Sequence, residues 1–216
     1  LSLSMFSAGI TITLLLYDTL SDASLHFGND FQGFFAFYSL IIAITSVLLQ
    51  FLSGRIIEKF GIKNSFAFLP FSMLLASIIN FFIPGICGSA PSQGLTRITL
   101  DTVDQSNRKA YQAFVPDEKR GRVSIFIDSY LPSLGTILGS LLAFGIIFWG
   151  VSKGMARETL SSIYLGVGVI AAIVAVVAFF LMYSTYDQSL LNWQMKRRSR
   201  GSSVMDLLDF SDEENK

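Results

Sequence analysis

The sequence has few charged residues. They make up 15% of its 216 residues, whereas soluble domains contain roughly 25%. The single cysteine, Cys87, cannot form a disulfide within the chain. The 16 lysines and arginines are balanced by 16 aspartates and glutamates, so the chain has no excess of positive charge to attract nucleic acid. These absences exclude a disulfide-rich domain, argue against a soluble one, and predict no nucleic-acid partner.

The common enzyme motifs are missing too. The chain has no HExxH, no GxSxG and no phosphate-binding GxxxxGK[ST] pattern. The single histidine, His26, has Asp22 and Asp30 nearby, but one histidine and two carboxylates in a connection make a poor metal signature. We therefore expect no catalytic residues, no cofactor and no metal site.

Apolar residues dominate the chain. Hydrophobic residues make up 51% of it, phenylalanine occurs 20 times, and the mean hydropathy is +0.54. About 20 apolar residues are needed to cross a bilayer. Six stretches approach that length, namely 2–21, 34–53, 65–84, 92–113, 124–149 and 160–183. The pattern predicts an all-α integral membrane domain of six transmembrane helices, residues 1–193, embedded in a lipid bilayer.

Lysine and arginine are concentrated in alternate connections and in the C-terminal segment. These residues are Arg55, Lys59, Lys63, Lys119, Arg120, Arg122, Lys196, Arg197, Arg198 and Arg200. The opposite connections, near 22–33, 85–91 and 150–159, contain only Lys153 and Arg157. Positive residues favour the cytoplasmic side. We therefore expect a multi-pass protein of a bacterial inner membrane or an organelle membrane, with both ends of this chain in the cytoplasm.

The fourth stretch is the most polar, and its charges follow the helical period. They are Arg97, Asp101, Asp104 and Arg108. In a regular helix these spacings place all four within about 60° of one another, and Gln93 and Tyr111 extend the stripe at its two ends. Charges within a bilayer are costly and often mark a substrate path. We interpret the stripe as a substrate site; the alternative is a buried ladder of ion pairs that holds helices together.

Other polar and small residues leave two interpretations open. Asp128 could pair with Arg120 or Arg122 to close a gate, or it could anchor the start of its helix. In the same segment Pro132 predicts a kink, and the pair Gly135 and Gly139 predicts close helix packing.

Asp18 and Asp22 share a helical face near the end of the first stretch. They could bind a coupling cation, but we favour a simple location at the membrane interface, where charge costs little.

The segment 194–216 changes from basic to acidic. We expect a disordered cytoplasmic tail whose basic part contacts anionic headgroups. A short partner-binding helix around Leu207, Leu208 and Phe210 is the alternative.

Three segments resemble a known family. GRIIEKFGIKN at 54–64 resembles the short cytoplasmic loop between the second and third spans of each half of major facilitator superfamily transporters. LLQFLSGRIIEKFG, TRITLDTVDQSNRKAYQAFVPDEKRGRVSIFID and LPSLGTILGSLL together resemble the ATP/ADP translocase (nucleotide transporter) branch. The similarity extends over roughly residues 15–183. It implies the C-terminal six-helix half of a twelve-span transporter, with an N-terminal half as its partner.

The resemblance implies a secondary transporter that works by alternating access on a small organic anion such as a nucleotide. Arg97 and Arg108 would attract the anion, since guanidinium groups pair bidentately with phosphate or carboxylate, and Asp101 and Asp104 would tune these charges. The gating and loop residues would be Arg55, Lys59, Arg120, Arg122 and Asp128. The alternative is a membrane scaffold or assembly factor that retains the carrier fold without transport.

Overall fold

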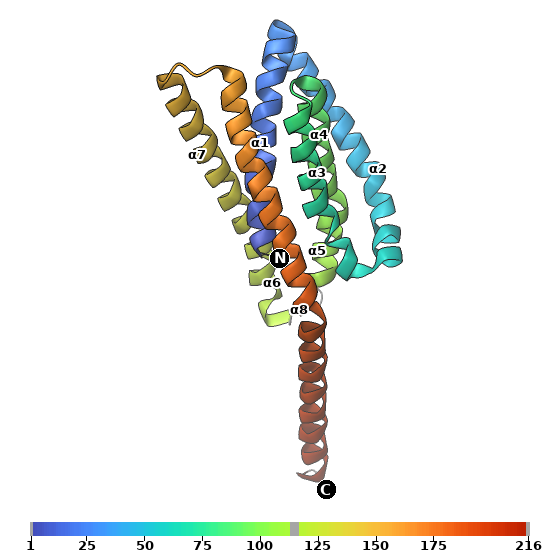
Figure 1. Ribbon diagram of the computed structural model, residues 1–216. Coiled ribbons are helices and arrows are strands. Elements are labelled where there is room, and N and C mark those ends of the chain that lie inside the picture. Colours follow the sequence, from blue (N-terminus) through green and yellow to red (C-terminus); the bar gives the residue numbers. More distant parts are fainter. Residues whose placement is uncertain (1, 113–116, 215–216) are drawn as a thin grey trace. The chain divides into compact units, whose positions relative to one another are not determined.

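The computed structural model describes the backbone of residues 2–112 and 117–214, and the side chains of 2–112, 119–186 and 191. Across this part of the chain the regular secondary structure is helical, with short turns at 66–67, 83–85 and 153–156. The elements are α1 (Ser2–Phe27), η1 (Gly28–Asp30), α2 (Phe31–Ser65), α3 (Phe68–Phe82), α4 (Ile86–Thr99), η2 (Leu100–Asp104), α5 (Gln105–Gln112), α6 (Asp117–Ile125), η3 (Phe126–Tyr130), α7 (Leu131–Ser152) and α8 (Arg157–Glu214) (Figure 1). The segments η2 and η3 are π-helical. The chain divides into two compact units, Leu1–Phe180 and Leu181–Lys216.

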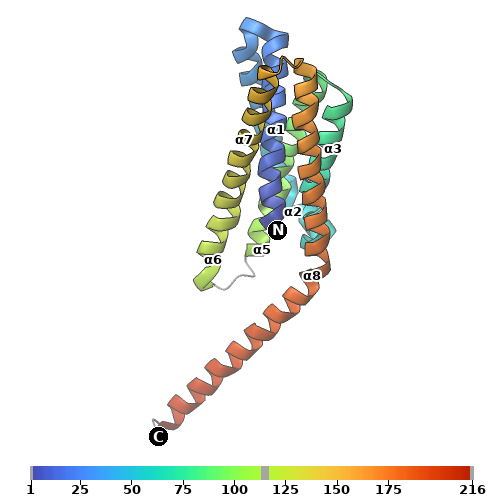
Figure 2. The ribbon, with the colours of Figure 1, turned by 60° about the vertical axis from the view of Figure 1, so that its left-hand side comes forward.

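The helices fall on the six stretches predicted from the sequence. In the first unit α1, α2, α3, α4 with α5, α6 with α7, and the start of α8 run in alternating directions (Figures 1 and 2). Three stretches are long and apolar enough to cross a membrane: Ser2–Ser65, which contains both α1 and α2, Lys119–Ser152 and Arg157–Tyr186. The shorter α3 is apolar as well. The all-helical prediction is therefore confirmed, and the apolar helices suit a membrane.

The outer surface of the unit is rich in large apolar side chains. On α2 these include Phe37, Leu48 and Phe51, and on α7 they include Phe144 and Phe148, all strongly exposed. Soluble proteins rarely expose such extended apolar faces. In a bilayer the same faces would contact lipid chains at no cost.

Helix α1 occupies the centre of the first unit. Its buried residues Met5, Ala8 and Ile12 pack with Leu69 and Met73 of α3. Further along, Ile10, Leu14 and Leu15 form a second cluster with residues of α3, α7 and α8. Through these two clusters α1 packs against α3, α7 and α8.

Glycines permit the closest of these contacts. A Cβ atom added to Gly135 would lie only 2.3 Å from the carbonyl oxygen of Phe6 and 3.0 Å from Gly9 Cα, and one added to Gly9 would lie 2.6 Å from the carbonyl oxygen of Pro132. At Gly139 the added atom would approach Thr13 Cβ to 3.1 Å. The predicted role of Gly135 and Gly139 in close helix packing is confirmed, and the partner helix is α1.

Two boundaries differ from the sequence-based expectation. The segment 54–64 is not a loop, because α2 continues to Ser65 and is interrupted only at Gly61, whose φ of 78° is non-helical. That conformation favours glycine. The tail expected to be disordered after residue 193 lies within α8, whose helix continues to Glu214. The segment contains Gly201 but no proline, and most of its residues tolerate a helix.

We predict that Gly135→Ala destabilises the protein by about 1–3 kcal/mol, because the new methyl group must separate two backbones in contact. The matched control is Gly145→Ala on the same helix, where nothing lies within 4 Å of the added atom. That change should not lower the free energy of unfolding, since alanine has a higher helix propensity than glycine. Denaturant unfolding of the purified protein in detergent measures both, and equal stability of the two variants would contradict the packing described here.

Candidate functional site

Two π-helical turns bring together three charged side chains, of which Arg108 and Asp104 are buried and Asp128 is partly buried. Arg108 Nε donates to Asp104 Oδ2 at 2.8 Å, one turn away, and Arg108 Nη1 lies 2.5 Å from Asp128 Oδ1 in η3. The side chains of Arg108 and Asp104 are 9% and 3% exposed. One guanidinium thus bridges two carboxylates from different helical segments, a geometry suited to a bidentate cation.

Asp128 has further donors. Gln112 Nε2 donates to its Oδ2 at 2.9 Å, Ser124 Oγ at 3.1 Å, and Lys109 Nζ lies 3.5 Å away. The cluster therefore has two cations for two carboxylates, and it ties α5 to η3. We expected Arg120 or Arg122 to pair with Asp128, and the structure gives it Arg108 and Lys109 instead. The gate and the helix anchor that we considered for Asp128 stay predictions.

The π turns have local causes. Pro132 lacks the N–H that would bond the carbonyl of Asp128, four residues earlier, and its ring would clash with that carbonyl in a regular helix. A wider turn over Phe126–Tyr130 accommodates both effects. Before and within η2, hydroxyls of Thr96, Thr99 and Thr102 bond to carbonyls three or four residues earlier. Such bonds compete with the backbone ladder and bend helices.

The π turn at Leu100–Asp104 splits the predicted stripe in two. A π turn contains about one extra residue, so the residues after it rotate by roughly 100° relative to those before it. Arg97 and Asp101 form an ion pair of 2.8 Å with side chains 51% and 37% exposed, whereas Asp104 and Arg108 are buried. The prediction that all four charges share one face is therefore wrong. Arg97 before the turn and Asp101 within it are accessible. Asp104 at the end of the turn and Arg108 after it are buried.

Gln93 and Tyr111, predicted at the ends of the stripe, are both in contact with other elements. Gln93 is buried, and its Oε1 contacts the hydroxyl of Tyr38, which also donates to the carbonyl of Ala90 at 2.7 Å. Tyr111 is half-buried and stacks edge-on against Phe66, with ring centroids 5.9 Å apart. Gln93 thus joins α4 to α2, and Tyr111 packs beside the end of α2.

The other predicted gating residues are exposed. Arg55 and Lys59 lie near the end of α2, and the Lys59 ammonium lies 5.9 Å from the centre of the Phe60 ring. Arg120 and Arg122 lie in α6. Residues 113–116, which belong to the longest motif of the family resemblance, lie outside the described part of the chain.

Sequence reasoning missed a second buried carboxylate. Asp18, which we assigned to the membrane interface, is 3% exposed. It accepts hydrogen bonds from Asn80 Nδ2 at 2.8 Å, Ser161 Oγ at 2.8 Å and Tyr164 Oη at 2.5 Å. The interfacial interpretation is wrong for Asp18. A signal was present, since Asp18, Asn80, Ser161 and Tyr164 all lie where antiparallel helices reach the same end of the unit.

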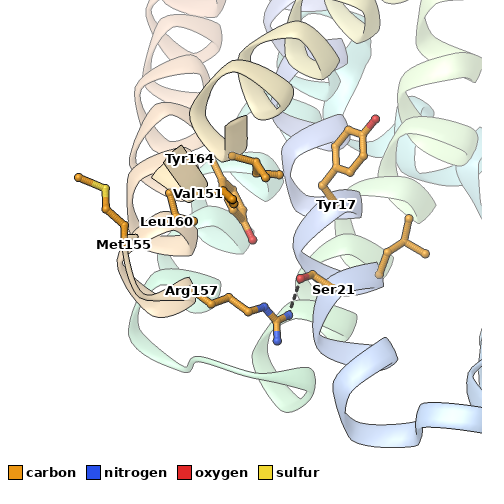
Figure 3. Close-up of a pocket in the computed structure, with 9 residues that line it drawn as sticks. Tyr17, Ser21, Val151, Met155, Arg157, Leu160 and Tyr164 are labelled. Carbon is orange, nitrogen blue, oxygen red and sulfur yellow. Dashed lines mark hydrogen bonds between the residues drawn. The ribbon is translucent and has the colours of Figure 1, made fainter. Parts of the chain in front are cut away.

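A cavity of about 540 Å³ adjoins this carboxylate site between α1, α7 and α8. Its lining is mostly apolar and includes Leu20, Ile147 and Leu160, with Tyr164 on the wall and Arg157 as its cation. Figure 3 shows Arg157 extending from the start of α8 to Ser21 of α1. The Arg157 guanidinium also lies 3.5 Å from Asp22.

The two arginines of the former stripe should differ in their effect on stability. We predict that Arg108→Ala lowers the free energy of unfolding by about 3–5 kcal/mol, because it leaves the buried Asp104 without its cation and removes one of the two cations of the partly buried Asp128. Arg97→Ala, a matched change in an exposed i,i+4 pair, should cost at most about 1 kcal/mol. Denaturant unfolding in detergent compares them. Losses of the same size would show that the burial difference has no energetic consequence.

The chain matches no protein-family model, and comparison with curated proteins gives no match either. The resemblance to nucleotide translocases therefore rests on the sequence motifs alone, and membership of that branch remains a proposal.

Proposed function

We propose that this chain is the C-terminal six-helix half of a major-facilitator-type secondary transporter, which moves a small organic anion such as a nucleotide by alternating access. The apolar outer faces of α2 and α7 support an integral membrane protein. The alternating helix directions support the expected topology, because they group the last residues of α2 and α5 at one end and those of α1, α3 and α7 at the other.

The observation that carries the proposal is the exposed Arg97–Asp101 pair. A guanidinium with half its side-chain surface accessible, on a helix segment between apolar neighbours, is available to an anion. Arg108 is not equally available, because its Nε and Nη1 already donate to Asp104 and Asp128. An arriving phosphate or carboxylate would replace Asp101 as the partner of Arg97. We therefore assign the anion contact to Arg97 alone, and no longer to both Arg97 and Arg108.

The contacts of Arg108 with Asp104 and Asp128 support the change of conformation that alternating access requires. Two π turns, one with the carboxylate of Asp104 and the other with that of Asp128, meet at Arg108. Interrupted helices of this kind occur at functional positions in transporters. Because Arg108 contacts both segments, any motion of α5 against η3 must break or exchange one of its two ion pairs.

The topology can be tested by cysteine labelling. With Cys87 replaced by serine, single cysteines at Lys59 and Lys119 should react with an impermeant reagent only from the cytoplasmic side, and one at Lys153 only from the opposite side. All three native residues are exposed. The six-span arrangement requires the chain to cross the membrane once between positions 119 and 153. Labelling of both positions from the same side would therefore contradict it.

Transport is tested by uptake of labelled nucleotides and other organic anions into vesicles containing the intact protein. We predict that Arg97→Ala reduces uptake at least about tenfold while expression and thermal stability stay near wild type, because an anion loses a direct charged contact worth more than about 1.4 kcal/mol. Arg97→Lys should recover part of the activity.

The matched control is Lys153→Ala, which removes an exposed cation from the α7–α8 connection and should leave uptake unchanged. Undiminished uptake by Arg97→Ala would remove Arg97 from the substrate site. Absence of uptake by the wild-type protein for every anion tested would instead favour the scaffold alternative.

A further inference from the structure

The partners of Asp18 differ in kind from those of the other buried carboxylates. Asp104 and Asp128 each form an ion pair with Arg108, and Asp128 also with Lys109, and these cations can only donate hydrogen bonds, although Gln112 and Ser124 donate to Asp128 as well. Asp18 is held by an amide and two hydroxyls, from Asn80, Ser161 and Tyr164. Each of these three groups can donate or accept. They can therefore satisfy a protonated carboxylic acid as well as a carboxylate, which an arginine cannot do.

One atom of this site is unsatisfied while Asp18 accepts all three bonds. Asn80 is 1% exposed, its Nδ2 donates to Asp18 Oδ2, and its Oδ1 has no hydrogen-bond partner. A buried carbonyl oxygen without a donor costs roughly 1–3 kcal/mol. If Asp18 acquires a proton, rotation of the Asn80 amide places Oδ1 where the acid can donate to it. The protonated state thus uses Asn80 Oδ1 as an acceptor, whereas the ionised state leaves that atom without a donor.

The site also has a route to the solvent-accessible cavity. Tyr164 lines that cavity and donates to Asp18 Oδ1. A proton can therefore reach Asp18 Oδ1 through this hydroxyl, which gives its own proton to the carboxylate and takes another from a hydronium ion in the cavity. A half-turn of the carboxyl group about its Cβ–Cγ bond then exchanges its two oxygens and brings the protonated one to the side that faces Asn80. No bond other than these O–H bonds changes, and the tyrosine ends as it began.

The other ionisable groups near Asp18 leave its negative charge without a direct counter-ion. On α1, Asp22 lies one turn away, and on α8 the guanidinium of Arg157 contacts Ser21 and Asp22. Tyr164 of α8 and Tyr17 of α1 line the cavity. From α3 the contact is the uncharged Asn80. Among the described side chains no cation forms an ion pair with Asp18, and the nearby Arg157 pairs with Asp22.

We propose that Asp18 is a proton-binding site, in which a proton entering from the cavity through Tyr164 neutralises the buried carboxylate and the Asn80 amide reverses to accept its hydrogen bond. Under the proposed transport function, which this inference deepens, the bound proton is the coupling ion, and its loss or gain accompanies the change of access.

Infrared spectroscopy of the purified intact protein in lipid measures the proton directly. We expect a carbonyl band of a protonated, buried carboxylic acid to appear as the pH is lowered and to be absent in Asp18→Asn. The control Asp30→Asn, which removes an exposed carboxylate from η1, should leave that band unchanged. A band that persists in Asp18→Asn, or the lack of any such band in the wild-type protein, would overturn the proposal.

A conservative second variant covers failure of Asp18→Asn to fold. Tyr164→Phe keeps the ring on the cavity wall and removes the hydroxyl through which the proton passes, so the band should appear more slowly after a drop in pH than in wild type. An unchanged rate would contradict the role of Tyr164 and the route assigned to the proton.

Uptake measurements separate this inference from the proposed function. If anion uptake driven by a pH gradient loses its pH dependence in Asp18→Asn, both the coupling role of Asp18 and the proposed transport function stand. If uptake occurs and keeps its full dependence on the gradient in that variant, the coupling role fails while transport stands. If the infrared band titrates but no anion is taken up by any variant, the proton site stands without the transport function.

Discussion

The interaction on which the polar interior depends is the sharing of one guanidinium between two carboxylates. A lone charge in an apolar bundle costs several kcal/mol, so Arg108, Asp104 and Asp128 can be buried only together. The requirement fixes the relative positions of α5 and η3 more strictly than apolar packing does, because lipid-like side chains can slide but an ion pair at 2.5–2.8 Å cannot. It also explains why the charges after η2 point inward while Arg97 stays accessible.

The first unit therefore contains two kinds of helix contact, one between closely packed backbones and one between polar side chains. Where α1 meets α7, glycines let the backbones touch, and the Thr13 hydroxyl beside Gly139 bonds to the Gly9 carbonyl of its own helix. Where α5 meets η3, the contact is made of charges and hydroxyls on widened turns. Close glycine packing suits parts that move as one body, whereas a polar contact with several donors can be remade in a second arrangement. Motion in this unit should thus concentrate at the π turns.

Most of the fold was predictable because hydropathy and glycine position act locally. The six apolar stretches, the non-helical Gly61 and the close approach at Gly135 and Gly139 all follow from residue type and spacing. The site was predictable only in part. The stripe assumed a regular period of 100° per residue, and one π turn was enough to separate Arg97 from Arg108. The pairing of Arg108 with Asp128 and the burial of Asp18 depend on which helices become neighbours, and a single sequence does not specify this.

The carboxylates Asp18, Asp104 and Asp128 show how its surroundings decide what an acid in the bundle can do. Asp104 and Asp128 each pair with a cation that cannot accept a hydrogen bond, so adding a proton to either would remove the negative charge that holds the Arg108 guanidinium. Asp18 faces an amide and two hydroxyls but no cation, and each of these partners can reverse its role to accept a hydrogen bond from the protonated acid. The charged cluster is therefore suited to holding a conformation through its ion pairs. The uncharged cluster around Asp18 is suited to exchanging a proton without unfolding its surroundings.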